Sequence, residues 1–463
     1  MEPLTKKPRV EGITADDKRR KVSAVLESLV LDEAKVHMIM EVMEQQIDFA
    51  NSPREEDRKR SDMFWECTYV QGLLKGDEEG DYLGLDLGST NFRVVRVTFN
   101  KGEAKTTTKY YNLPQELLSG PADGAFDHIA ESIEKFIKEE KMTSDTDVAL
   151  GFTFSFPSVQ KSLKHSVLIT WTKSFKCTTG PGEDPVGMLE AAIQRRGGLS
   201  IPVNVVARIS DTTGTLMAGN YLDRNCRIGL IIGSGSNACF VEQAKNFNKL
   251  EAAEKTSDQI LVNCEWGAFG DNGCLDFFKT EFDKELDQNS NHVNSYTFEK
   301  LFGGFYLGEL VRLVLVKLTN EGLLFKGQGS PKLMSKGSWP TSYVTEVESD
   351  GPGETSHTCK VLQNLDLTGD ADDIALVQEA CALVSQRGAY IVSAACAVLL
   401  NHIDLPDVTI GIDGSVYEHH PKFHGYMMEL LEKLVPKTKV KIILVKDGSG
   451  QGGAFVAAVG SRT

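Results

Sequence analysis

The chain has 463 residues, 41% of them hydrophobic and 25% charged, which is ordinary for a soluble globular protein and favours two domains over one. The formal net charge of −15 argues against nucleic acid or an anionic membrane as the main partner. Nine cysteines are scattered without a CxxC pair or a zinc-like cluster, which predicts reduced thiols in a cytoplasmic protein.

The first 70 residues predict two helices and a connecting segment. Residues 1–20 are polar and charged, so no signal peptide is expected, and no apolar run approaches membrane-spanning length. The basic cluster at residues 6–9 fits a solvated tail better than a nuclear-import patch. Apolar residues at helical spacing predict a helix before Asp32 and another after it, with Asp32 as the cap of the second. A loop is expected over residues 51–61, and residues 63–70 then lead from one domain to the other.

Residues 83–97 read as two strands of a hairpin, because apolar residues alternate on both sides of a short turn. The turn, from Asp86 to Arg93, contains a carboxylate, a glycine and two hydroxyls. Glycine lets consecutive backbone N–H groups point into one concavity, and such a nest binds phosphate. Asp86 at the strand end can hold Mg²⁺, usually through water, where a triphosphate would lie.

The remaining chain alternates strands with helices, which predicts a largely parallel sheet with ligands at the carboxyl ends of its strands. Helices are expected over residues 126–137, 298–318, 374–400 and 452–459, and strands over residues 148–154, 203–209, 408–412 and 440–444. Three strands end in polar turns, at Ser210-Asp211-Thr212, at Asp413-Gly414-Ser415 and at Asp447-Gly448-Ser449-Gly450. Residues 351–356 read as a surface loop.

A second hairpin of the same kind, with the turn Gly233-Ser234-Gly235-Ser236-Asn237, spans residues 228–240. Two such hairpins about 145 residues apart predict a duplicated α/β unit that grips nucleotide phosphates between its halves. This is the actin-like, ribonuclease-H-like architecture. The two turns resemble those of the hexokinases, which read D-L-G-G-T-N-F-R and G-T-G-x-N-A.

Further phrases strengthen the resemblance to the hexokinase family. G-F-T-F-S-F-P occurs unchanged at residues 151–157, and W-T-K-G-F has its counterpart in W-T-K-S-F at residues 171–175. N-T-E-W-G-A-F-G corresponds to residues 263–270, and E-K-L with Y-L-G-E-L-V-R to residues 299–301 and 306–312. D-G-S-V-Y and D-G-S-G occur at residues 413–417 and 447–450. The similarity therefore covers roughly residues 63–460 in the family's order.

The resemblance implies a role for each matching residue. Asp211 is the general base that accepts the proton of a sugar hydroxyl, and Lys173 contacts both the sugar and the transferring phosphoryl group. The implied sugar contacts are Ser155, Thr172, Lys173, Ser210, Asp211, Asn237, Glu265 and Glu299. The implied nucleotide contacts are Asp86, Gly88, Ser89, Thr90, Asn91, Arg93, Gly233, Ser234, Gly235, Ser335, Ser338, Asp413, Gly414, Ser415, Gly448, Ser449 and Gly450, with Asp86 also holding Mg²⁺.

Several positions depart from the family pattern. Ser89 stands where the family has a second glycine, and a Cβ at a positive φ costs about 1 kcal/mol. Ser210 replaces an asparagine that bonds the sugar, so a water fills the gap or a hydroxyl goes unpaired, and sugar binding is weakened by roughly 0.5–3 kcal/mol. Gln451 and Gly453 could weaken the nucleotide end, and Ser174 replaces a loop glycine.

The resemblance implies an ATP-dependent hexokinase that phosphorylates the 6-hydroxyl of glucose or a related hexose. We expect a small lobe of residues 73–212, completed by 448–463, and a large lobe of residues 213–447 with residues 1–72. A cytoplasmic monomer acting on small molecules is expected. Two alternatives stay open: a catalytically weak, hexokinase-like sugar sensor, and a non-catalytic actin-like scaffold that uses ATP only for conformation.

Overall fold

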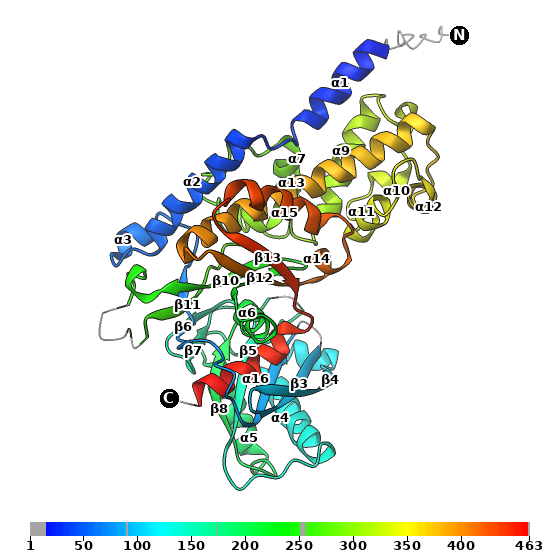
Figure 1. The fold of residues 1–463 in the computed structure, drawn as a ribbon. Coiled ribbons are helices and arrows are strands. Elements are labelled where there is room, and N and C mark those ends of the chain that lie inside the picture. Colours follow the sequence, from blue (N-terminus) through cyan, green and yellow to red (C-terminus); the bar gives the residue numbers. More distant parts are fainter. Residues whose placement is uncertain (1–14, 89–90, 173, 251–254, 256, 462–463) are drawn as a thin grey trace.

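The computed structural model describes residues 15–88, 91–172, 174–250, 255 and 257–461. Figure 1 shows two sheet-containing lobes, one above the other, with α6 and α16 between them. The small lobe has a five-stranded sheet in the order β4-β3-β2-β5-β8. The large lobe has a six-stranded sheet in the order β1-β11-β10-β9-β12-β13. The boundaries expected for the two lobes stay a prediction.

Both predicted hairpins are confirmed, and the two sheets repeat one topology. In the small lobe, β2, β3 and β4 pair antiparallel, and β5 and β8 then add parallel to β2. In the large lobe, β9, β10 and β11 pair antiparallel, and β12 and β13 add parallel to β9. The strands are β1 (Glu66–Cys67), β2 (Gly80–Leu87), β3 (Asn91–Asn100), β4 (Glu103–Asn112), β5 (Val148–Phe154), β6 (Ser158–Gln160), β7 (Ser166–Leu168), β8 (Val203–Ile209), β9 (Cys226–Ile232), β10 (Ser236–Gln243), β11 (Gln259–Asn263), β12 (Asp407–Asp413) and β13 (Lys439–Leu444).

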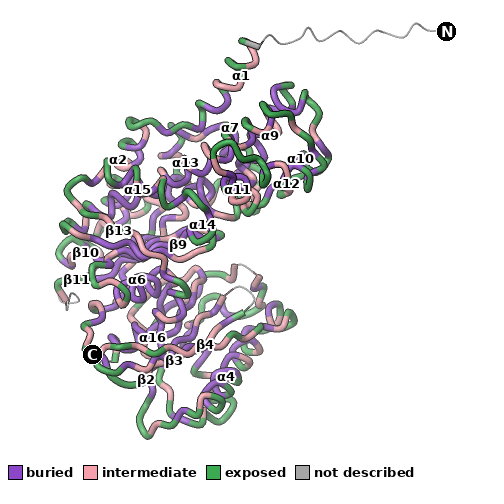
Figure 2. Tube along the Cα trace, turned by 45° about the vertical axis from the view of Figure 1, so that its right-hand side comes forward, coloured by how far each residue is buried: buried purple, intermediate pink, exposed green. Residues whose placement is uncertain are grey.

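Helices cover both faces of each sheet. In the small lobe, α4 (Ala122–Glu139) and α5 (Pro185–Arg195) pack on one face, and α6 (Asp211–Leu222) with α16 (Gly448–Gly460) pack on the other. In the large lobe, α2 (Glu33–Ala50), α13 (Ala371–Ile403) and α15 (Phe423–Leu434) cover the outer face. Burial along the trace is densest in the two sheets and the helices between them (Figure 2).

A separate helical cluster extends the large lobe away from the sheets. Its core joins leucines and valines of α1, α7, α9, α11, α12 and the first half of α13. The remaining helices are α1 (Ala15–Glu27), α3 (Glu55–Arg58), α7 (Glu281–Gln288), α8 (Thr297–Lys300), α9 (Leu307–Asn320), α10 (Pro331–Met334), α11 (Thr341–Glu348), α12 (Ser356–Asn364) and α14 (Ser415–His419).

Three expectations from the sequence need correction. Residues 51–61 include the short helix α3, because Glu55, Glu56 and Asp57 favour a helix N-terminus there. The helix expected over residues 298–318 is interrupted between α8 and α9. There Gly303 and Gly304 leave the helix and contact the turn at residues 233–237, which is called the second phosphate turn below; the turn at residues 86–93 is the first. The polar turn at residues 448–450 is the first turn of α16.

The long helix α13 also corrects the statement about apolar runs. Within the described residues it is the one helix long and apolar enough to cross a membrane, with a mean hydropathy of 1.5. Packing explains this composition, since 83% of its most apolar window is buried inside the protein. Asp370 starts the helix with a reciprocal capping box to Asp373.

Candidate active site

The predicted base Asp211 is the first residue of α6, at the carboxyl end of β8. The preceding Ser210 caps the helix, and its Oγ accepts a hydrogen bond from the Thr213 N–H at 3.4 Å. The Thr212 N–H donates to Asp211 Oδ1 at 2.8 Å. The positive end of the helix dipole stabilises a carboxylate at this position. The fold therefore holds Asp211 at a fixed strand-to-helix junction.

The predicted sugar loop, residues 155–157, lies against this junction. The Asp211 N–H donates to Ser155 Oγ at 3.2 Å, so the two predicted sugar contacts are neighbours. Phe156 packs edge-on against Trp171 and Phe175, with ring centroids 5.2 and 4.9 Å away. This aromatic cluster fixes the segment that contains Thr172 beside the sugar loop. The predicted phosphoryl contact Lys173 lies outside the described residues.

The large lobe contributes a network of amides and one buried carboxylate. Asn237 Nδ2 donates to Glu265 Oε1 at 2.9 Å, and Asn263 Nδ2 donates to the same oxygen at 2.6 Å. Thr212 Oγ1 donates to Asn263 Oδ1 at 3.0 Å, which links the network to α6. Glu265 has a φ of 45°, a left-handed conformation that a non-glycine residue rarely adopts. The surrounding hydrogen bonds hold this strained residue in place.

Three carboxylates share this site. Burial raises the pKa of Glu265, and the charge of Asp211 raises it further, while the Asn263 hydrogen bond opposes the change. Burial likewise raises the pKa of Glu299, against the hydrogen bond that its Oε2 accepts from the Ser236 N–H at 3.1 Å. Asp211 and Glu265 both act on Glu299 through their charge. The structure thus gathers acceptor groups from both lobes at one place.

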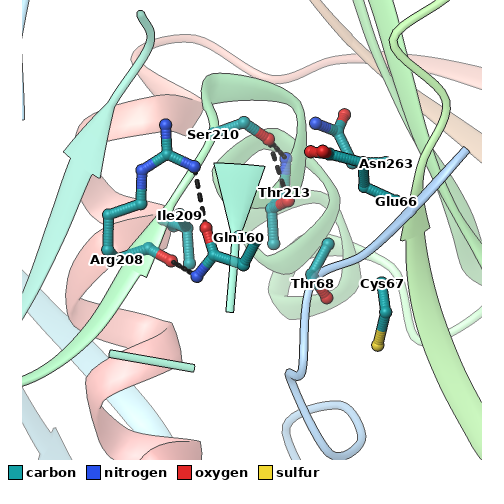
Figure 3. Close-up of a pocket in the computed structure, with 9 residues that line it drawn as sticks. All are labelled: Glu66, Cys67, Thr68, Gln160, Arg208, Ile209, Ser210, Thr213 and Asn263. Carbon is teal, nitrogen blue, oxygen red and sulfur yellow. Dashed lines mark hydrogen bonds between the residues drawn. The ribbon is translucent and has the colours of Figure 1, made fainter. Parts of the chain in front are cut away.

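A small polar cavity lies beside the base (Figure 3) and has room for about one water molecule. Ser210 and Thr213 border it on α6, and Arg208 and Gln160 face each other across its small-lobe side. The lining residues are Glu66, Cys67, Thr68, Gln160, Arg208, Ile209, Ser210, Thr213 and Asn263. A cavity at Ser210 agrees with the gap expected where the family has the longer asparagine.

Six of these polar residues were not among the predicted site residues: Glu66, Thr68, Gln160, Arg208, Thr213 and Asn263. A sequence signal existed for two of them. Arg208 is the one charge in the otherwise largely apolar strand β8, and Asn263 starts the quoted N-C-E-W phrase. Burial raises the pKa of Glu66 to about 7, with a further contribution from the charge of Glu265.

The first phosphate turn is tied to the start of α16. Arg93 pairs with Asp86 at 2.7 Å between Nη2 and Oδ2, and also with Asp447. Ser449 Oγ donates to the same Asp86 oxygen at 2.9 Å. The Gly88 N–H donates to the Asn91 carbonyl at 2.9 Å and closes the turn. Ser89 and Thr90, and with them the expected positive φ, lie outside the described residues.

The second predicted phosphate turn, residues 233–237, lies between the predicted sugar contacts and the polar turn at residues 413–415. The Gly233 N–H donates to the Gly235 carbonyl at 3.0 Å, and the Phe305 N–H donates to the Ser234 carbonyl at 3.0 Å. A Cβ on Gly235 would overlap the Glu299 carboxylate, so a larger residue there would displace that side chain. Gly414, at a φ of +122°, packs against the backbone of Ile232 and Gly233. The turn is therefore held between the predicted sugar and nucleotide residues.

Asp413 links this turn to α16. It accepts hydrogen bonds from the Gly414 N–H at 2.7 Å and from the Gly448 N–H at 3.1 Å. Burial raises its pKa to about 6. Ser415, exposed at the start of α14, follows directly. The N-terminal turn of α16, residues 448–450, thus lies between the first phosphate turn and Asp413, where backbone N–H groups at the helix start and the helix dipole favour a phosphate.

Ser335 and Ser338 lie between α10 and α11. Ser335 Oγ donates to the Pro331 carbonyl at 2.9 Å, and Ser338 Oγ is buried without a hydrogen-bond partner in the described part of the chain. Thr341, shortly after them, donates to the Gly304 carbonyl at 2.6 Å. The described contacts of the two serines do not reach the second phosphate turn directly, so their predicted adenosine contacts stay a prediction.

Comparison with known proteins identifies the family. Two hexokinase family models match the chain, one over residues 21–221 and the other over residues 227–459. The chain belongs to the hexokinase family. It is 34% identical to the hexokinase from Schistosoma mansoni solved in complex with glucose, with a TM-score of 0.84 over 96% of this chain and 99% of that one. This match confirms the two-lobed, actin-like hexokinase fold.

Curated relatives agree with this assignment. The chain is 41% identical to mouse hexokinase-1 over 418 residues and 42% identical to horse hexokinase-2 over 404 residues. These alignments cover 88% and 85% of this chain, and 42% and 43% of the relatives. The chain therefore spans less than half the length of the curated relatives it matches.

Proposed function

We propose that this protein is an ATP-dependent hexokinase that transfers the γ-phosphoryl group of Mg-ATP to the 6-hydroxyl of glucose or a related hexose. The observation that supports this most directly is the meeting of Asp211, Ser155 and the Asn237–Glu265 network at one site, beside two phosphate turns. Membership of the hexokinase family supports the same reaction class.

In this mechanism Asp211 accepts the hydroxyl proton as phosphoryl transfer proceeds. A sugar hydroxyl is a weak nucleophile at neutral pH, so a positioned carboxylate that removes its proton accelerates attack. Glu265 and Glu299 accept hydrogen bonds from other sugar hydroxyls, while the amide of Asn237 can donate one. Lys173, by its place in the W-T-K phrase, offsets the charge that develops on the transferring group.

The nucleotide phosphates would lie between the two turns and the N-terminus of α16. Backbone N–H groups of the turns and the helix supply anion-binding donors that a chain of net charge −15 cannot supply through its overall field. Arg93 is the cation beside this position, and its pKa is raised by the charges of Asp86 and Asp447, against the effect of burial. It is therefore fully protonated.

The residues present fit a magnesium ion shared with the nucleotide. No group of three or more His, Cys, Asp or Glu that could hold a metal occurs among the described residues. Mg²⁺ is normally held by one or two carboxylates together with substrate phosphates, and Asp86 offers such a carboxylate. Bound Mg²⁺ would offset negative charge on the phosphates. Asp86→Asn should raise the Mg²⁺ concentration that gives half-maximal rate.

Enzyme assays with a matched aspartate control test the proposed reaction. ADP formation from Mg-ATP is measured with and without glucose for the wild type, Asp211→Asn and Asp32→Asn. Asp32 caps α2 at a distant helix N-terminus and accepts a hydrogen bond from the Lys35 N–H at 2.8 Å. Loss of a general base lowers kcat by about 10²–10⁴-fold, so Asp211→Asn should fall in this range and Asp32→Asn should match the wild type.

A wild type that binds glucose but forms no more ADP than Asp211→Asn would disprove the enzyme and identify a sugar sensor. A wild type that binds ATP but no hexose would favour the scaffold. The proposed location is cytoplasmic, and the presence of all nine cysteines as free thiols supports a reducing compartment.

A further inference from the structure

The buried arginine next to the base is the feature that the mechanism does not use. Arg208 is the penultimate residue of β8, three positions before Asp211, and only 7% of its surface is exposed. In the described part of the chain its guanidinium donates to three neutral oxygens rather than to a carboxylate. Burying a charge without a direct ion pair is costly, so a lone buried guanidinium demands an explanation.

The three acceptors surround the sugar loop. Arg208 Nη2 donates to the Phe154 carbonyl at 2.7 Å and to the Phe156 carbonyl at 3.2 Å, on the two sides of Ser155. Nη1 donates to Gln160 Oε1 at 2.8 Å. A planar guanidinium can bridge several acceptors at once, so it fixes the path of residues 154–160 relative to β8.

Arg208 and Gln160 each donate a hydrogen bond to the other, and these two bonds close a ring beside the loop. Gln160 Nε2 donates back to the Arg208 carbonyl at 3.1 Å and to the Ser162 carbonyl at 2.7 Å. The Arg208 N–H donates to the Leu163 carbonyl at 2.8 Å. The small β6–β7 hairpin that follows the sugar loop leads on to Thr172. Arg208 therefore holds the first part of the segment that carries the small-lobe sugar contacts, from Phe154 to Leu163.

The charge of Arg208 also faces the acidic groups of the site. Burial lowers its pKa, while Glu66, Glu265, Asp211 and Asp184 favour its protonated form. In return, its positive charge opposes the raised pKa values of Glu66 and Glu265. Glu66 lies on β1 and Glu265 in the turn after β11. Asp211 begins α6 and Asp184 directly precedes α5. Within the described residues, the charge of Arg208 thus acts on several carboxylates while its printed hydrogen bonds go to neutral oxygens.

We propose that Arg208 is a positioning residue for hexose phosphorylation, whose guanidinium holds the Ser155 loop against the strand that ends at Asp211. The inference rests on the proposed function, since it assigns the loop to the hexose. It does not require Arg208 to contact either substrate. Removing it should therefore disturb the sugar side of the reaction and leave nucleotide binding almost unchanged.

The test compares Arg208→Met with Arg227→Met. Arg227 is a suitable control because it also lies on a strand, β9, and donates to backbone carbonyls, those of Arg224 at 2.6 Å and Cys226 at 2.9 Å. The measurements are kcat and KM for glucose, KM for ATP, the melting temperature, and hydrogen exchange of residues 155–169. Arg208→Lys is added because it keeps the charge but cannot bridge three acceptors.

Arg208→Met should lower kcat/KM for glucose at least about tenfold, change KM for ATP less than about twofold, and speed hydrogen exchange in residues 155–169. Arg208→Lys should show the same pattern to a smaller degree, and it serves alone if the methionine variant does not fold. Arg227→Met should show neither effect. Equal losses in the Arg208 and Arg227 variants, or unchanged exchange in residues 155–169, would overturn the inference.

The failure of the proposed function would look different. In that case the wild type itself forms no glucose-dependent ADP. Faster exchange of residues 155–169 in Arg208→Met would then still support the holding of the loop, and unchanged exchange would refute it.

Discussion

His402 on α13 joins three parts of the large lobe and gives the protein a pH-dependent contribution to stability. Its Nδ1 lies 2.9 Å from Glu242 Oε2 on β10, and its Nε2 lies 3.0 Å from Glu44 Oε2 on α2. Burial alone would lower the pKa of His402, but hydrogen bonds to the two carboxylates raise it to about 10. At neutral pH an imidazolium therefore bridges two glutamates.

The magnitude follows from the difference between the folded and unfolded pKa values. A histidine with an unfolded pKa near 6.5 and a folded pKa of about 10 contributes at most about 5 kcal/mol to the free energy of unfolding. The contribution is complete below pH 6.5 and is lost as the pH rises through 10, because the folded state binds the proton more tightly. Glu44 is 43% exposed, so solvent screening reduces the expected loss between pH 7 and 9.5 to about 2 kcal/mol.

Chemical denaturation of the wild type and His402→Gln at pH 7 and pH 9.5 tests this reasoning. The wild type should be more stable than the variant at pH 7, and that advantage should shrink by about 2 kcal/mol at pH 9.5. His37→Gln is the control, since His37 is 53% exposed and only 3.8 Å from Glu33 in the same helix. An advantage of equal size at both pH values would refute a charged His402.

Three further changes test the sugar site. Ser210→Asn keeps an acceptor for the Thr213 N–H and fills the adjacent cavity. KM for glucose should therefore fall several-fold with little change in melting temperature. A rise in KM would contradict the role given to this position. Gly235→Ala forces a Cβ into the Glu299 carboxylate and should lower glucose affinity at least about tenfold in a binding titration, whereas retained affinity would show that the turn can move. Glu265→Gln keeps one oxygen for the two amide donors but removes the charge and turns the other carboxylate oxygen into a donor, so it should abolish saturable glucose binding at millimolar concentrations while ATP binding persists; glucose binding of wild-type strength would exclude Glu265 as a contact.

The sequence predicted the parts of the fold that follow local patterns. Strands β5 and β8 were expected with the bounds that they have, because their mainly apolar segments end at polar turns. Both hairpins and the helix N-cap at Asp32 were likewise readable, since alternation and capping depend on neighbouring residues.

Two features of the fold depend on tertiary contacts and could not be predicted from local sequence patterns. The break between α8 and α9 depends on Gly303 and Gly304 packing against the second phosphate turn, about 70 residues earlier in the chain. Strand β4 was missed because its residues are mostly polar and none of them is buried, and pairing with β3 stabilises them.

In the candidate site, too, some residues could be predicted from local sequence and others depend on tertiary contacts. Residues in contiguous phrases, such as Ser155 and Glu265, could be assigned through their motifs and are brought close to Asp211 and Asn237. Glu66 gave no such signal, and Arg208 was marked only as a charge within a largely apolar strand; its role depends on the groups that fold around it. No local pattern states which carbonyls a guanidinium will bridge.

The last helix has a consequence for how the protein must be made. The backbone of α16 lies directly against β2, β5 and α6, at glycine contacts that leave no room for a side chain. Strands β2 and β5 are synthesised about 360 and about 290 residues before α16, so the face of the small-lobe sheet that α6 and α16 cover together stays only partly covered until the ribosome has nearly reached residue 460. During that interval the exposed apolar face is open to chaperones and to aggregation. A chain whose translation stops before α16 would therefore be an aggregation-prone fragment rather than a separately folded lobe.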